Sequence, residues 1–270
     1  MFGKDPGGKS VGISRGMQLM NTERERYGLL DTIRGLTLLS MICYHGVWDL
    51  VYLYGVKWDW YLGRGAYVWQ QSICWTVILL SGFCWPLGKK PFKRGVLVFG
   101  CGCVITLVTC LFMPENRVVF GVLTLIGSCM LIMIPVHRLL NHGVRKKGIA
   151  AAGLTVSFLL FFLSRNINRG FLGFEGWNMV KLPEGWYQGM VSTCLGFTAP
   201  SFYSTDYFSL FPWFFLFLGG YFLYYVLQRD KGLSPVFTCE FVPLRIAGRY
   251  SLPVYMLHQP VLYLIFSFLC

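Results

Sequence analysis

Seven stretches of mostly apolar residues, each close to the length of a membrane-crossing helix, dominate this sequence. A helix needs roughly 20 consecutive apolar residues to cross the hydrocarbon core of a bilayer. The sequence therefore predicts an all-α fold, a polytopic membrane bundle of about seven transmembrane helices. The expected spans are residues 29–54, 68–87, 95–113, 118–136, 148–163, 208–227 and 250–269.

The composition excludes a soluble globule of ordinary make-up. Of the 270 residues, 55% are hydrophobic and only 13% are charged, and the apolar stretches leave no room for a separate soluble domain. The first residues are polar and glycine-rich, without the apolar core of a cleavable signal. We expect a disordered cytoplasmic tail over residues 1–22 and one transmembrane domain over residues 23–270.

The formal charge of +12 is distributed in a way that favours a membrane rather than nucleic acid as the partner. Lysine and arginine gather in alternate connections between the apolar stretches, as the positive-inside rule describes. We therefore expect a multi-pass protein of the cell membrane, with a cytoplasmic N-terminus and an extracytoplasmic C-terminus. The clusters are Lys4 to Arg26, Lys89 to Arg94, Arg138 to Lys147 and Arg229 to Arg249.

One long connection, residues 164–207, is expected on the outer side. It is rich in glycine and aromatic residues, and loops of this length are often functional. Residues 186–197 are predicted to form an interfacial or additional membrane helix. Trp186 is a candidate for stacking on a sugar face, although a tryptophan here can equally anchor the chain at the lipid headgroups.

The first apolar segment carries four ionisable side chains on one helical face. Successive residues of an α-helix turn by 100°, so Arg34 and His45 lie about 20° apart, with Asp31 and Asp49 about 60° away from Arg34. Charges that contact lipid are costly, and we therefore expect this stripe to face the interior of the bundle.

The stripe also spans the depth of the bilayer. With Leu29 at the inner boundary, Arg34 lies about 7 Å into the hydrocarbon core and His45 about 24 Å. Asp49, one turn beyond His45, is expected to orient the imidazole and favour its charged form. The alternative is structural: an ion pair between Asp31 and Arg34, with His45 bonded to a neighbouring helix.

A second intramembrane histidine, His258, precedes Pro260 in the last segment. It either adds to a polar interior or serves only helix packing. The ten cysteines lie mostly in apolar segments without a CxxC pair, so we expect no metal site and no permanently bound cofactor. The glycine-rich patterns of nucleotide-binding folds are absent as well.

Four blocks of the sequence, in order, resemble the catalytic domain of the heparan-α-glucosaminide N-acetyltransferase family. They are "RYGLLDTIRGLTLLSMICYHGVWDL" (26–50), "FGVLTLIGSCMLI" (120–132), "STDYFSLFPWFFLFLGGY" (204–221) and "GRYSLPVYMLHQP" (248–260). The spacing of Arg34 and His45 is also similar to that of membrane acyltransferases that O-acetylate surface sugars, a related superfamily.

The resemblance implies an acetyl-CoA-dependent O- or N-acetyltransferase that modifies glycans or similar polar acceptors outside the cytoplasm. Arginine suits phosphate contact, so Arg34 is the candidate for binding the donor, acetyl-CoA. His45, supported by Asp49, would deprotonate the acceptor or carry the acetyl group covalently. A homo-oligomer is compatible with this interpretation.

Asp206 precedes the sixth segment and has two interpretations. It either caps that helix through the amides of its first turn or joins His45 and Asp49 in holding the acceptor. The alternative function for the whole chain is a proton-coupled transporter or channel, in which the Arg34, His45 and Asp49 side chains form a path.

Overall fold

The computed structural model describes residues 27–141, 143–228, 233, 237 and 239–269. The predicted tail, residues 1–22, lies outside this part of the chain. Within it, seven long helices coincide with the seven apolar segments: α2 (Gly28–Tyr52), α3 (Arg64–Phe83), α4 (Pro91–Phe112), α5 (Val122–Leu140), α6 (Lys147–Leu163), α8 (Leu210–Leu227) and α10 (Ser251–Leu269). Two shorter helices are α7 (Gly189–Leu195) and α9 (Val242–Arg249), and short 3₁₀ turns cover Asp59–Leu62, Pro114–Asn116, Ile167–Arg169 and Glu184–Trp186.

By length and composition, four helices of the described chain are able to cross a membrane. They are α4, α5, α6 and α8. The other three long helices, α2, α3 and α10, are not among them. The structure thus confirms a helical membrane protein. That all seven long helices cross the membrane remains a prediction.

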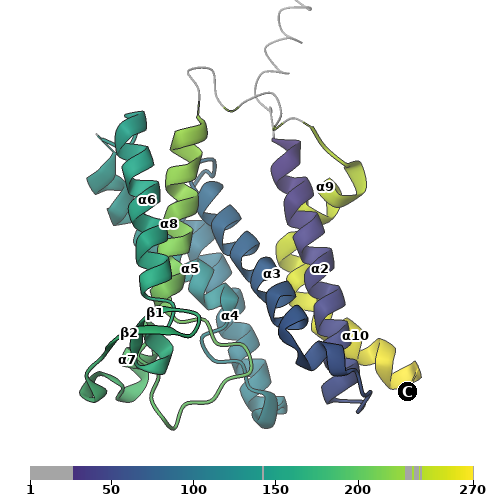
Figure 1. Ribbon diagram of the computed structural model, residues 1–270. Coiled ribbons are helices and arrows are strands. Elements are labelled where there is room, and N and C mark those ends of the chain that lie inside the picture. The colour runs from purple at the N-terminus through teal and green to yellow at the C-terminus, as the bar shows by residue number, and fades with distance from the viewer. Residues whose placement is uncertain (1–26, 142, 229–232, 234–236, 238, 270) are drawn as a thin grey trace, which may run out of the picture.

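The long helices run alternately up and down (Figure 1). The first residue of α2 lies at the same end as the connections from α3 to α4 and from α5 to α6, while the hairpin and α7 lie at the opposite end. The basic residues Lys89, Lys90 and Arg145 therefore share one end of the bundle with the start of α2. We call this the basic end and the other the hairpin end.

The largest core cluster lies where α3, α5, α6 and α8 meet. Its fully buried members include Ile78, Met133, Phe161, Phe217 and Tyr221. Gly82 and Gly220 allow α3 and α8 to approach closely, because a Cβ on either would lie within 2.0 Å of a backbone oxygen of the other helix. Small residues at such positions are a common means of packing membrane helices.

Helix α2 is held against the C-terminal helices by a similar contact. A Cβ on Gly35 would lie 1.9 Å from the carbonyl oxygen of Leu244, and one on Gly248 would lie 1.8 Å from that of Asp31. The short helix α9 thus packs directly on the first turns of α2, and α10 continues along α2 toward the hairpin end (Figure 1). This contact aligns the polar face of α2 with α10.

The connection between α6 and α8 departs from the all-α prediction. It contains an antiparallel hairpin of β1 (Phe171–Phe174) and β2 (Trp177–Lys181), the one strand pair in the described ranges. Glu175 and Gly176 form the turn and both have positive φ, of 38° and 85°, which is typical of a tight hairpin turn. The helix predicted within 186–197 is present as α7.

Candidate functional site

A basic cavity of about 350 Å³ lies beside the first turns of α2, at the basic end. It is formed where α2 meets the end of α3, the start of α4 and the end of α9. Its lining residues are Tyr27, Leu30, Asp31, Arg34, Cys84, Leu87, Gly88, Arg94 and Arg249. Three arginines face one aspartate, and the cavity therefore has an excess of positive charge.

The arginines of this cavity differ in how they are held. The Nη1 atom of Arg34 donates to Oδ1 of Asp31 at 2.7 Å, the ion pair that the sequence offered as the structural alternative. Arg94 Nη1 is buried without a hydrogen-bond partner in the described chain. The guanidinium of Arg94 also lies against Gly88, where a Cβ would meet it. A buried donor without a partner is costly, so an incoming anion would find a donor already in place.

A second polar site lies between α2 and α10, further along α2. The rings of His45 and His258 lie with their centroids 5.0 Å apart and their planes tilted by 58°. Asp49 is 1% exposed and accepts a hydrogen bond of 3.0 Å from Nε2 of Gln259. We call His45, Asp49, His258 and Gln259 the histidine cluster. Arg34 and His45, eleven residues apart on α2, are separated by about 16 Å along its axis.

Three buried atoms of the histidine cluster lack a hydrogen-bond partner among the described residues. They are Oδ2 of Asp49, Nε2 of His258 and Oε1 of Gln259. The Nδ1 atom of His258 lies 2.6 Å from the carbonyl oxygen of Tyr255, which can only accept, so Nδ1 carries the hydrogen and Nε2 of the neutral ring is an acceptor. All three unpartnered atoms are thus acceptors, and the cluster fits a ligand that brings hydrogen-bond donors.

The expected pairing of Asp49 with His45 is not found. Asp49 bonds to Gln259 of α10 instead, and the nearest ring neighbours of His45 are His258 and Tyr44. The pairing of Asp49 with His45 was expected because residues four apart on one helix are neighbours. The close approach of α10 brings in a competing donor from a residue 210 positions away.

Asp206 caps a helix, but a different one from the helix predicted. Its Oδ2 accepts a long hydrogen bond of 3.5 Å from the backbone N–H of Val122, the first residue of α5. The residue before α8 is Ser209, and it makes no side-chain cap. No hydrogen bond or ion pair joins Asp206 to His45 or Asp49, all of which are described. Burial raises the pKa of Asp206 to about 6, and the bond from Val122 opposes that shift.

Trp186 lies away from both polar sites. Its ring is half-exposed and contacts the edge of Phe197 at a centroid distance of 5.3 Å. Residues that the sequence did not single out, however, complete the two sites: Arg94 and Arg249 in the basic cavity, and Tyr255 and Gln259 beside His258. Gln259 and Tyr255 fall within the same sequence block as His258, which is the signal that was available. In the described ranges, no group of three or more His, Cys, Asp or Glu side chains is arranged to hold a metal ion.

Comparison with known sequences supports the resemblance seen in the four blocks. A family model described as "Heparan-alpha-glucosaminide N-acetyltransferase, catalytic" matches residues 26–260. The match includes the basic cavity and the whole histidine cluster. Neither a curated protein nor a solved structure matches the chain.

Proposed function

Since the chain belongs to the heparan-α-glucosaminide N-acetyltransferase catalytic-domain family, whose members are acetyltransferases, we propose that it transfers acetyl from cytosolic acetyl-CoA to a polar acceptor across the membrane. The acceptor is a sugar or a similar polar molecule outside the cytoplasm. In this proposal all seven long helices cross the bilayer. The basic end faces the cytoplasm and the hairpin end faces outward, in accord with the positive-inside rule.

The basic cavity would receive the charged part of the donor. Acetyl-CoA carries phosphates, and guanidinium groups bind phosphate oxygens with two parallel hydrogen bonds. Arg94, from α4, has an unpartnered buried donor, and Arg34, from α2, is held by its ion pair with Asp31. These residues would hold the donor while its thioester extends along α2 toward the histidine cluster.

The histidine cluster would carry out the proton transfer. A hydroxyl or amine of the acceptor donates to the unpartnered acceptors of His258, Asp49 and Gln259. As the acceptor attacks the thioester carbonyl, a bond forms from its oxygen or nitrogen to the acetyl carbon, the carbon–sulfur bond breaks, and imidazole takes the proton. The imidazolium then returns this proton to the departing CoA thiolate, which leaves as free CoA.

One observation carries this proposal: a single helix, α2, contributes Arg34 to a cavity with excess positive charge, and His45 with Asp49 to a cluster that holds three buried, unpartnered acceptors. The two sites lie about 16 Å apart along the helix axis. An acetyltransferase with donor and acceptor on opposite sides of a membrane needs such an arrangement. Neither a single histidine nor a single basic pocket, without the other on the same helix, would by itself indicate transfer across a membrane.

The test uses purified protein in detergent with acetyl-CoA labelled in its acetyl group. Release of free CoA that depends on an added amino sugar or sugar alcohol supports transfer. Brief incubation without acceptor, followed by mass spectrometry, distinguishes the covalent route, which predicts acetyl on His45 or His258. Proton-coupled uptake into liposomes without any release of CoA would instead favour the transporter alternative and contradict the proposal.

A further inference from the structure

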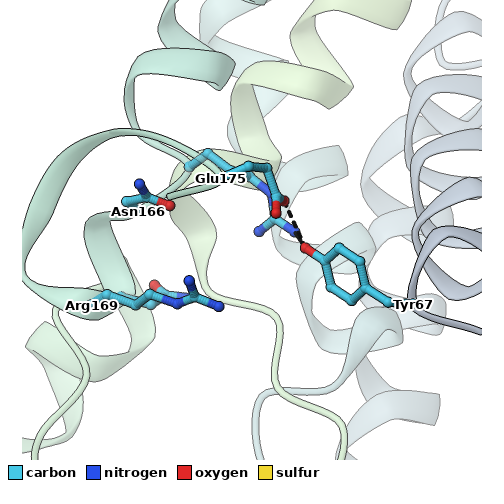
Figure 2. Close-up of a pocket in the computed structure, with 6 residues that line it drawn as sticks. Tyr67, Asn166, Arg169 and Glu175 are labelled. Atoms are coloured by element: carbon cyan, nitrogen blue, oxygen red, sulfur yellow. Dashed lines mark hydrogen bonds and ion pairs between the residues drawn. The ribbon is translucent and has the colours of Figure 1, made fainter. Parts of the chain in front are cut away.

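A second cavity, of about 170 Å³, lies at the hairpin end (Figure 2). Tyr67 of α3 forms one side, Arg165, Asn166, Asn168 and Arg169 follow the end of α6, and Glu175 reaches in from the hairpin turn. We call these six residues the outer pocket. Its volume is below the roughly 300 Å³ of common small-molecule sites. It therefore suits one functional group of a larger ligand rather than an entire ligand.

The floor of the outer pocket is a fixed polar network. Glu175 Oε1 accepts a hydrogen bond of 2.6 Å from the hydroxyl of Tyr67 and lies 3.6 Å from Nε of Arg165. Nη2 of Arg165 donates to Gln71 at 2.6 Å, and its guanidinium carbon lies 4.8 Å from the centre of a Trp213 ring. The side chain of Arg165 is only 12% exposed. Its charge is balanced by Glu175, so this pair contributes little net charge to the pocket.

Arg169 differs from Arg165 in having no partner. It is exposed, and among the described residues no ion pair or side-chain hydrogen bond holds its guanidinium. Figure 2 shows this side chain reaching across the pocket toward Tyr67 and Glu175. Because Glu175 already neutralises Arg165, Arg169 leaves the pocket with one uncompensated positive charge. Five N–H donors of a guanidinium are thus available to an incoming group.

The backbone around Glu175 is held in an uncommon conformation. Glu175 has a φ of 38°, a region that residues other than glycine seldom adopt. The hairpin turn keeps it there and aims the carboxylate at Tyr67 and Arg165. Conformations of this kind persist where the surrounding structure imposes them, and they are frequent at binding sites.

One face of α3 connects the outer pocket with the histidine cluster. Tyr67, Gln71 and Cys74 lie four and three residues apart and so share a helical face. Cys74 and Tyr255 both pack against the core cluster where α3, α5, α6 and α8 meet. The ring of Tyr255 in turn contacts His258 at a centroid distance of 5.3 Å. A ligand that occupies the outer pocket therefore lies at one end of an α3 face that packs on the same core cluster as Tyr255.

We propose that the outer pocket binds a carboxylate or phosphate group of the acceptor, with Arg169 as the ion-pairing residue and the side-chain NH2 of Asn168 as a further donor. This inference rests on the proposed function only in calling the bound molecule the acetyl acceptor, because a binding site alone does not require transfer. It narrows the acceptor to molecules that carry an anion in addition to the hydroxyl or amine that receives acetyl. Charge-assisted hydrogen bonds from arginine supply the selectivity.

The test compares three sugars that share one ring: methyl glucoside, methyl glucuronide and glucose 6-phosphate. Their affinities are measured by equilibrium binding to the full chain in phosphatidylcholine nanodiscs, without acetyl-CoA. Arg169→Gln removes the charge, and Lys181→Gln is the matched control, because Lys181 is an outer-side cation that pairs with Glu184 away from the pocket. Unchanged thermal unfolding and acetyl-CoA binding establish that both variants fold.

The proposal predicts that the two charged sugars bind the wild type and Lys181→Gln at least about tenfold more tightly than methyl glucoside, a difference of about 1.4 kcal/mol. In Arg169→Gln this preference disappears. Equal affinities for all three sugars, or a preference that survives in Arg169→Gln, would overturn the proposal. So would loss of the preference when phosphatidylglycerol is added to the nanodiscs, because a lipid headgroup would then be the occupant.

The outcomes separate this inference from the proposed function. If the charged sugars bind preferentially but no acetyl transfer is ever detected, the outer pocket stands as an anion site and the transferase proposal fails. If acetyl is transferred to sugars without any preference for the charged ones, the transferase proposal stands and the outer pocket assignment is overturned.

Discussion

The ring of His258 donates from Nδ1 to the carbonyl oxygen of Tyr255, three residues earlier in α10, at 2.6 Å. This bond selects the tautomer whose other nitrogen, Nε2, has a free lone pair, and that atom is buried without a partner. The ring of His258 lies 5.0 Å from the ring of His45 on α2, between centroids. The arrangement suits a group that accepts a proton.

His258→Gln is expected to abolish most of the transfer activity. Glutamine can still donate to the Tyr255 carbonyl, but it cannot act as a base near neutral pH. We expect the turnover number to fall by at least about a hundredfold, with acetyl-CoA binding unchanged. Turnover at close to the wild-type rate would return His258 to a role in helix packing.

His45→Gln tests the other member of the pair. If both rings serve one proton path, each single variant loses most of the activity and the double variant loses little more. The effects of substituting residues that act as a unit are strongly non-additive. Steady-state rates of the two single variants and the double variant measure this. Independent losses that multiply in the double variant would contradict a shared path.

Asp49→Asn is expected to cost less activity than His45→Gln. Asparagine keeps an oxygen that accepts from Gln259, whereas the negative charge is lost. The measurement is the ratio of turnover numbers for the two variants under the same conditions. A larger loss in Asp49→Asn than in His45→Gln would mean that the carboxylate itself takes the proton.

Arg34→Lys and Arg94→Lys are expected to raise the KM for acetyl-CoA more than they lower kcat. Lysine keeps the charge but loses the planar fork that binds phosphate through two hydrogen bonds. Loss of one such bond, worth about 1.5 kcal/mol, corresponds to about a tenfold change in KM. Lys93→Gln is the control, since this exposed neighbour of Arg94 does not line the cavity. A KM unchanged in both arginine variants would leave Arg34 as a structural partner of Asp31.

The apolar segments, and with them the seven long helices, were predictable because hydropathy is a local property of the sequence. The shared face of Arg34, His45 and Asp49 was equally predictable, since it depends only on helical geometry. The contacts between distant segments were not. Gln259 reaches Asp49 over 210 residues and Asp206 reaches Val122 over 84, and both contacts depend on which helices pack together.

The hairpin of residues 171–181 was also missed, because its strands are short and lie in a glycine-rich loop in which only a helix within residues 186–197 was expected. The positive φ values at Glu175 and Gly176 define its turn. Only the packing of this turn on α3 brings Glu175 to Tyr67. The outer pocket therefore could not be read from the sequence.

Asp206→Asn is expected to change how stability depends on pH. Burial raises the pKa of Asp206 to about 6 in the folded protein, above the value of about 3.9 for an unfolded aspartate. The folded state thus binds a proton on the Asp206 carboxyl more tightly than the unfolded state does. The stability that this protonation contributes is lost as the pH rises from about 4 through about 6. Unfolding midpoints across this range should fall more steeply for the wild type than for Asp206→Asn. Parallel profiles would show that the carboxylate is hydrated and does not titrate with folding.

The most direct test of the account is sided transfer in proteoliposomes that hold the protein in one orientation, verified by protease access to the basic end. Labelled acetyl-CoA is supplied on one side only, and an amino sugar acceptor on the other. The account predicts labelled product on the acceptor side, with CoA released on the donor side, when acetyl-CoA is present at the basic end and not when it is present at the hairpin end. Product formed only when donor and acceptor share one side would contradict transfer along α2 from the basic cavity to the histidine cluster.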